Sequence, residues 1–196
     1  MFTRRHLIAG LGAATALSHP AFATPRSADT PNAETWVVPP EHQPKQVRFS
    51  GNVAANEIHV LPTRRQLFWT LSETEAMQYA VAIGTDDQYE PGTFFVGRKA
   101  EWPSWTPTRN MIRRFPEKYA QFRGGVPGGP DNPMGARALY LYTASGRDTL
   151  LRIHGTPHPW TIGQAASNGC VRMVNDHVTA LYDQVPKGTR VVLHPR

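Results

Sequence analysis

Turn-forming residues recur throughout this 196-residue chain and leave only short segments between them. Pro62-Thr63 and Pro91-Gly92, for example, separate runs of four to eight apolar or alternating residues. Runs of that length are typical of β-strands, whereas helices usually need about ten residues or more. We expect strands at residues 57–61, 66–71, 76–83, 93–96, 138–143, 149–153 and 189–193. The chain should therefore fold as a mainly β domain.

Two segments carry helix signals instead. Apolar residues recur at helical spacing over residues 174–185, with Asn175 as the expected cap and Pro186 as the stop. A second short helix is expected over residues 111–119, interrupted at Pro116. Helices should therefore be few and short.

The N-terminal residues predict an export signal. Paired Arg4 and Arg5 precede a short apolar run, and the small residues Ala21 and Ala23 follow it. This order predicts a signal peptide over residues 1–23 of the twin-arginine type, which would carry the chain to the periplasm. The run is too short to span a bilayer, so no stable membrane span is expected; an uncleaved interfacial anchor is the alternative.

Prolines are frequent in residues 24–46 and predict an extended tether. Trp36, Val37 and Val38 offer an alternative within it, because they can pack as a first strand or strap. Residues 47–196 would then form a single domain of ordinary size.

Charge gives little support to nucleic-acid binding. Residues 1–23 carry two of the 21 Lys and Arg residues and none of the 15 acidic ones, so their removal lowers the net charge from +6 to +4. No run of Lys or Arg is longer than a pair. Two interpretations stay open: a solvated basic surface, or attraction to an anionic cell-wall polymer.

Cys170 is the only cysteine of the chain. An exported protein with one cysteine cannot form an internal disulfide, and its thiol is either reactive, buried or paired with another molecule. His154 lies sixteen positions upstream, with Pro157, Pro159 and Gly163 in between. Because these residues exclude one continuous helix, the intervening loop can bring His154 and Cys170 together as base and nucleophile.

The residues around Cys170 suit acyl transfer. Gly169 permits an unusual backbone angle, so the amides of Asn168, Gly169 and Cys170 can converge as oxyanion donors. Ser167 is expected to brace this turn through its hydroxyl. If the chain is extended after Cys170, alternation buries positions 171 and 173. The same alternation places Arg172 on the face of Cys170, as a planar fork for a substrate carboxylate.

His154 ends the expected strand at 149–153 and is followed by Gly155, which permits an unusual backbone angle and close approach. A zinc site is an alternative use of these residues, since His158 and His177 are also ligand types. Their spacing to His154 and Cys170 matches no ligand pair on one helix, however. We therefore expect no metal.

Together these residues resemble the signature of one family. The chain is similar to L,D-transpeptidases of the YkuD type, in the branch that includes ErfK, YbiS, YcfS and YnhG. The resemblance rests on His154-Gly155-Thr156 followed by Ser167-Asn168-Gly169-Cys170-Val171-Arg172. Further similar blocks at residues 102–107, 111–114 and 128–139 extend it over roughly residues 47–193. One departure is Asn168, where many members of the family have histidine.

The resemblance implies a single YkuD-like mixed β-sandwich domain with one or two short helices. Residues 98–137, which contain six prolines and several glycines, would be a long insertion that lines the active-site cleft. Trp102 and Trp105 would line this cleft, and Arg137 would hold a carboxylate. The alternative is a proline-stiffened loop that packs only its own aromatic side chains.

The resemblance also implies a reaction that needs no cofactor. Cys170, deprotonated or held as a thiolate by His154, would attack the diaminopimelate carbonyl of a peptidoglycan tetrapeptide stem and expel D-alanine. One nitrogen of the His154 ring would be held by a backbone carbonyl such as that of Gly155. An amine would then resolve the thioester, giving a 3→3 cross-link or the attachment of a lipoprotein or outer-membrane protein to the wall. Cys170 would also be a target of carbapenems.

Three alternatives remain open from the sequence alone. Water as the acceptor would make the same site an L,D-carboxypeptidase. Another Cys-His peptidase or amidase would share the nucleophile but form no cross-link. A noncatalytic wall-binding protein would form no covalent adduct.

Overall fold

The structure is a computed structural model that describes residues 35–51, 53–85 and 87–196. The predicted export signal at residues 1–23 lies outside the described residues, as does the first part of the predicted tether. In the described part of the tether, Trp36 and Val38 pack against Ala82, Ile162 and Val174 without forming a strand. Of the two alternatives for this segment, a first strand or a strap, the structure therefore contains the strap.

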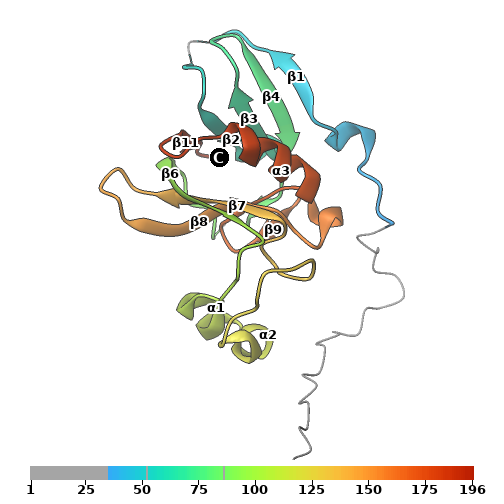
Figure 1. Ribbon diagram of the computed structural model, residues 1–196, viewed down its shortest axis with the longest axis vertical. Helices are drawn as coiled ribbons and strands as arrows, with labels where there is room; N and C mark the ends of the chain where they lie inside the picture. The colour runs from blue at the N-terminus through green and yellow to red at the C-terminus, as the bar shows by residue number, and fades with distance from the viewer. Residues whose placement is uncertain (1–34, 52, 86) are drawn as a thin grey trace, which may run out of the picture. The chain divides into compact units, whose positions relative to one another are not determined.

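A nine-stranded mixed sheet is the main element of the fold (Figure 1). Its strands lie in the order β1-β4-β3-β2-β11-β6-β7-β8-β10. The β2–β11 and β8–β10 pairs are parallel, and the other pairs are antiparallel. The strands are β1 (Lys45–Arg48), β2 (Ile58–Leu61), β3 (Gln66–Thr70), β4 (Glu75–Ala80), β6 (Gly92–Glu101), β7 (Arg137–Tyr142), β8 (Asp148–His154), β10 (Val171–Arg172) and β11 (Arg190–Leu193). A separate parallel pair joins β5 (Ile83–Gly84) to β9 (Ala165–Ser167).

Three α-helices accompany the sheet in the described part of the chain. They are α1 (Arg109–Arg114), α2 (Pro116–Tyr119) and α3 (Asn175–Gln184), with short 3-10 turns at η1 (Pro40–His42), η2 (Pro62–Arg64), η3 (Ala120–Phe122) and η4 (Pro159–Thr161). Pro116 is the first residue of α2 and separates it from α1, which confirms the expected interruption. The helix expected over residues 174–185 is confirmed as α3.

Asn175 does not cap α3, contrary to the expectation. Val174 holds the N-cap position, and no side chain caps this helix. The side-chain oxygen of Asn175 instead accepts hydrogen bonds from the amides of Ala136, at 3.0 Å, and Thr156, at 3.1 Å. One amide precedes β7 and the other follows β8, so Asn175 ties together the ends of these two adjacent strands.

The opposite end of α3 is held by Lys99 of β6. Its Nζ donates to the carbonyls of Tyr182, at 2.6 Å, and Val185, at 2.7 Å. Carbonyls at the end of a helix have no intrahelical donor, so this ammonium supplies one and also places a positive charge at the negative end of the helix. α3 is therefore fixed at both ends against one face of the sheet.

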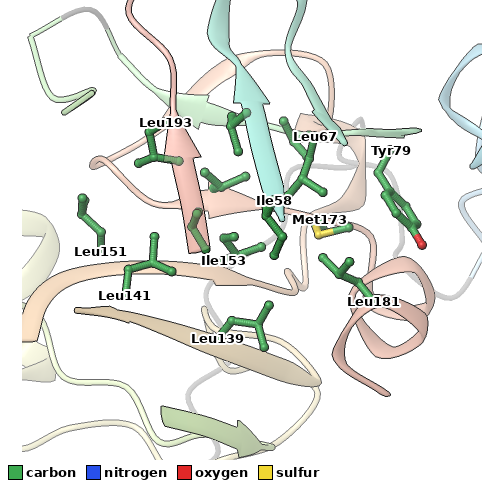
Figure 2. Packing of buried hydrophobic residues seen from close by; sticks show 14 of the residues in the cluster. Ile58, Leu67, Tyr79, Leu139, Leu141, Leu151, Ile153, Met173, Leu181 and Leu193 are labelled. Atoms are coloured by element: carbon green, nitrogen blue, oxygen red, sulfur yellow. The ribbon is translucent and has the colours of Figure 1, made fainter. Parts of the chain in front are cut away.

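The hydrophobic core gathers residues from both halves of the sheet and from α3. Ile58 and Leu67, from β2 and β3, belong to the same buried cluster as Leu139 and Ile153, from β7 and β8, and Leu181 from α3. Figure 2 shows these side chains converging in one space. The sheet therefore curves until its two halves face each other, as expected for a mixed β-sandwich.

Most predicted strands match observed ones. The runs at residues 57–61, 66–71, 138–143, 149–153 and 189–193 correspond to β2, β3, β7, β8 and β11. β6 is longer than predicted and reaches Glu101, while the run at 76–83 is divided between β4 and β5. β1 has no counterpart among the predicted strands and begins within the predicted tether.

The insertion between β6 and β7 lies over the sheet face opposite α3 (Figure 1). Trp105 and Met134 of this insertion pack with Ala138 and Tyr140 of β7. Leu139, the intervening residue of β7, lies in the core that includes α3. The insertion therefore covers the sheet and does more than pack its own aromatic side chains.

We expect Gly155→Ala to destabilise the fold strongly. A Cβ at this position would lie 2.1 Å from Oδ1 of Asn175 and 3.0 Å from the amide of Ala136, so the junction of β7, β8 and α3 would have to open. The cost should be about 3 kcal/mol or more, which lowers the melting temperature by roughly 6–12 °C. Gly129→Ala is the matched control, because a Cβ there meets nothing within 4 Å. Equal melting temperatures for the two variants would contradict this account.

Candidate active site

Strand register brings the candidate residues to one face of the sheet. Val171 of β10 lies opposite Ile153 of β8, and Arg172 lies opposite His154. Val171 and Ile153 point into the core. Arg172 and His154 therefore point to the other face, and alternation places Cys170 beside them. The predicted burial of positions 171 and 173 is confirmed, since they are 1% and 0% exposed.

His154 is buried at the end of β8. Its Nδ1 lies 2.6 Å from the carbonyl oxygen of Gly155, which is the contact expected from the sequence. Burial lowers the pKa of His154 to about 3, and the nearby positive charge of Arg172 acts in the same direction. The ring is therefore neutral at ordinary pH. Because a carbonyl only accepts, Nδ1 carries the hydrogen and Nε2 is left as a proton acceptor.

Cys170 is half-buried and has a neutral thiol. Desolvation raises its pKa above the ordinary value, although Arg152 and Arg172 act in the opposite direction. Its Sγ lies 3.8 Å from the carbonyl oxygen of Leu150. Within the described residues it makes no hydrogen bond to the His154 ring. The Cys170 thiol and the neutral His154 imidazole thus lie on one face of the sheet, on adjacent strands and two residues out of register. They do not form an ion pair in this structure.

A short network of hydrogen bonds shapes the turn before Cys170. The Ser167 hydroxyl donates to the carbonyl of Cys170 at 2.5 Å and accepts from the Gly169 amide at 3.3 Å. The bracing contact expected of Ser167 is therefore present. Gly169 has a φ of +113°, which favours glycine, and its amide is already directed at Ser167. Asn168 donates from its side chain to the Tyr119 hydroxyl at 2.8 Å.

Arg172 is a cation without an anionic partner among the described residues. Its Nε is buried and makes no hydrogen bond. Burial lowers the pKa of this guanidinium, while its neighbours Cys170 and Tyr119 act in the opposite direction. A buried charge is costly unless it is paired, so this guanidinium could accept an anionic partner beside Cys170.

Arg137 lies apart from the other candidates. It pairs with Glu101 at 3.2 Å, and its guanidinium lies 5.6 Å from the ring centroid of Tyr182 on α3. Alternation along β7 explains the difference, because Ala138 shares the face of His154 and Arg137 therefore points to the other side. The expected carboxylate site at Arg137 is thus not beside Cys170.

The two tryptophans occupy different positions. Trp102 follows β6 in a left-handed backbone conformation with φ of +39°, and its side chain is 46% exposed. Trp105 makes edge contacts with Tyr119 and Phe122, at centroid separations of 6.2 and 6.0 Å. Trp105 therefore supports the residue that binds Asn168, and Trp102 is the more accessible of the two.

Tyr119 is the residue at this site that sequence reasoning missed. It is buried on α2 and joins the insertion to the turn before Cys170 through its hydroxyl. The aromatic density of residues 102–122 was the available signal, but no local pattern identifies which ring reaches a residue 49 positions away.

The zinc alternative finds no support in the geometry of the described residues. No group of three or more His, Cys, Asp or Glu side chains is arranged there to hold a metal ion. His177, one of the proposed ligands, lies on α3 beside Tyr79, at a ring-centroid separation of 6.2 Å.

None of the helices in the described part of the chain is long and apolar enough to cross a membrane.

Comparison with known proteins gives a consistent family assignment. A family model described as the L,D-transpeptidase catalytic domain, YkuD, matches residues 55–193. The probable L,D-transpeptidase ErfK/SrfK of Escherichia coli is 35% identical over 150 residues, which are 76% of this chain and 46% of that protein. The putative L,D-transpeptidase YqjB of Bacillus subtilis is 39% identical over 117 residues, or 59% of this chain and 57% of that protein. The chain thus spans about half the length of these relatives.

Solved structures share the fold. A Brucella melitensis protein described as a probable carnitine operon oxidoreductase is 42% identical, with a TM-score of 0.55 over 83% of this chain and 99% of that one. An L,D-transpeptidase from Mycobacterium smegmatis is 16% identical, with a TM-score of 0.51 over 70% of this chain and 58% of that one. The second similarity is one of fold alone.

We expect the reactivity of Cys170 to rise steadily with pH. Because its pKa is raised and His154 stays neutral, little thiolate exists at neutral pH, and the thiolate fraction grows about tenfold per pH unit. Alkylation of the single thiol by iodoacetamide, followed by mass spectrometry, should accelerate without a plateau between about pH 6 and pH 9. The alkylation rate of the urea-unfolded chain is the control, because there Cys170 is a solvent-exposed thiol with an ordinary pKa. A plateau near neutral pH would reveal a stable ion pair instead.

We also expect Tyr119→Phe to loosen the turn before Cys170. The substitution removes the hydroxyl that accepts from Asn168 and should cost about 1 kcal/mol, or roughly 2–4 °C in melting temperature. Tyr142→Phe is a matched control, since the Tyr142 hydroxyl makes no hydrogen bond within the described residues. Hydrogen exchange of the amides at 168–170 should increase in Tyr119→Phe alone. Unchanged exchange would show that the contact does not hold the turn.

Proposed function

Because the chain belongs to the L,D-transpeptidase catalytic domain family, we propose that it is a cysteine-dependent L,D-transpeptidase acting on peptidoglycan stem peptides. The observation that carries the proposal is the set of three groups on one sheet face: the sole cysteine, a buried neutral histidine and an unpaired arginine. These supply a nucleophile, a base and an anion site, which are the groups that acyl transfer from a charged peptide requires.

Acylation begins with proton transfer. Nε2 of His154 accepts the thiol proton of Cys170 as the sulfur attacks the diaminopimelate carbonyl of a tetrapeptide stem. A carbon–sulfur bond forms, and the bond to the terminal D-alanine breaks. The departing amine takes the proton back from His154, which leaves a thioester. The pKa directions support this order over a stored thiolate, since both groups are neutral before the substrate arrives.

Anionic charge on the substrate is held by Arg172. Its guanidinium lies beside Cys170 and lacks a partner within the described residues, so a stem-peptide carboxylate can take that place. The amides of Asn168 and Cys170 are the proposed donors to the oxyanion, since the Gly169 amide already donates to Ser167. Ser167 braces this turn through its hydrogen bond to the carbonyl of Cys170. Gly155 has no side chain and so allows Asn175 to approach closely, which fixes the loop after His154.

An amine resolves the thioester. The side-chain amine of a second diaminopimelate gives a 3→3 cross-link, and the lysine of a lipoprotein or outer-membrane protein gives a wall-attached protein. Water in place of an amine gives L,D-carboxypeptidase activity. The proposed place of this reaction is the periplasm, reached through the predicted twin-arginine signal at residues 1–23 and the tether that follows.

Intact-protein mass spectrometry tests the proposal. The protein is incubated with purified disaccharide tetrapeptide, with and without an amine acceptor. We expect an adduct that lacks D-alanine and that resolves into cross-linked product. Cys170→Ala should form no adduct while its melting temperature changes little, because the half-buried thiol contributes little packing. Resolution only to tripeptide would identify a carboxypeptidase.

His154→Gln should slow adduct formation by about 10²–10⁴-fold, since it removes the proton acceptor. The matched control is His177→Gln, which changes another buried histidine with a lowered pKa on α3. The control should retain the wild-type rate of acylation. An absent adduct in the wild type would contradict the proposal and favour a binding protein, or an activity such as that for which the Brucella melitensis relative is named.

A further inference from the structure

The row of side chains that contains Cys170 and Arg172 continues to Val174. All three alternate with residues of the main core and therefore face away from it. Val174 lies instead in a second, smaller buried cluster, together with Ala82 and Ile162. This second cluster therefore adjoins the candidate site on the side of Arg172.

Two members of the second cluster are tied to segments that form the site. Ala82 exchanges backbone hydrogen bonds with Arg172, at 2.7 and 2.9 Å, and so holds the register of the two-residue strand β10. Ile162 lies in the loop that joins His154 to Cys170. Because the cluster contacts both segments, its packing affects how the nucleophile is placed relative to the base.

The strap at residues 36–38 covers the second cluster. Trp36 and Val38 pack against it, whereas Val37 between them is 80% exposed. Within the described residues, none of the three makes a backbone hydrogen bond to the sheet. The strap is therefore held mainly by two side chains, of which Trp36 is the larger.

A further contact joins the same N-terminal segment to the loop before Cys170. His42, in η1, lies over Gly163, where a Cβ would be 2.9 Å from Nε2 of the histidine ring. Gly163 has a φ of +85°, and its amide donates to the carbonyl of Val81 at 3.1 Å. The segment at residues 36–42 therefore packs on this loop at two successive positions, 162 and 163.

We propose that Trp36 is a positioning residue for the acyl-transfer site. It acts through the second cluster, which fixes β10 and thereby holds Cys170 and Arg172 in place relative to His154. The catalytic effect of Trp36 rests on the proposed function, whereas its coupling to β10 is independent of that function. Part of the segment that the sequence predicts to be a tether is thus required for catalysis.

Hydrogen exchange tests the coupling. Trp36→Ala in the full chain removes the larger side chain that covers the cluster, and a two-residue strand has few other contacts that hold its register. We expect the amides of Ala82 and Arg172, followed by NMR, to exchange about tenfold faster than in the wild type. Val37→Ala is the matched control within the strap, because this side chain is exposed, and it should exchange like the wild type.

A comparison of two reactions at Cys170 tests the positioning role. Acylation by tetrapeptide needs aligned groups, and we expect it to slow about tenfold in Trp36→Ala, since small displacements of reacting groups are costly. Alkylation by iodoacetamide needs only access to the sulfur and should not slow. Trp36→Phe, which keeps an aromatic ring on the cluster, should restore most of the acylation rate. Met77→Ala, on β4 near the other end of the sheet, should lower the melting temperature without slowing acylation.

Four results would contradict these expectations. Unchanged exchange at Ala82 and Arg172 in Trp36→Ala would overturn the coupling of the strap to β10. Faster exchange with wild-type acylation would show that Trp36 supports the fold alone. Equal slowing of acylation in Met77→Ala would attribute the effect to lost stability, and either result would overturn the positioning role. An absent adduct in the wild type would contradict the proposed function and the positioning role with it, whereas the exchange of the two amides would still decide the coupling.

Discussion

The parallel pairing of β10 with β8 is the contact on which the whole site depends. It aligns Arg172 with His154 and sets Cys170 on the same face. β10 has only two residues, so its register needs outside support. The backbone of Arg172 exchanges hydrogen bonds with Ala82 at 2.7 and 2.9 Å, and β9 pairs with β5 just before the turn. A shift of one residue would turn Cys170 and Arg172 into the core, so these contacts hold the candidate site as well as the fold.

The alternation of apolar and polar residues made the strands of the sheet predictable. The register between strands could not be predicted, and this limited what the sequence indicates about the site. Each run in the sequence indicates which residues share a face within one strand, and the alternation of Cys170 and Arg172 was therefore derived correctly. The pattern within one strand does not indicate which residues of a neighbouring strand lie on the same face of the sheet. Arg137 directly precedes the predicted strand at 138–143, but only its pairing in the sheet reveals that its side chain points toward α3. β1 shows a further limit, because four mostly exposed residues offer no hydrophobic pattern.

Single polar residues were harder to place than strands, since their partners are remote in sequence. Asn175 has the residue type and position of a helix cap, and a local rule assigns it to that role. The observed partners, the amides of Ala136 and Thr156, both donate to the same oxygen because the start of β7 and the end of β8 meet the first turn of α3 there. Tyr119 and Asn168 form a similar long-range pair. Local propensity cannot predict such contacts, which are determined by tertiary packing.

Asp148 supports the backbone of β8 next to Cys170. Leu150 has a φ of +65°, which is unusual outside glycine, and its amide is satisfied by Oδ1 of Asp148 at 2.9 Å. This irregularity in β8 accompanies the turn of the Leu150 carbonyl toward the Cys170 sulfur. The same carboxylate binds both ends of the Arg152 guanidinium. One acid thus supports the left-handed backbone beside Cys170 and neutralises the buried guanidinium of Arg152.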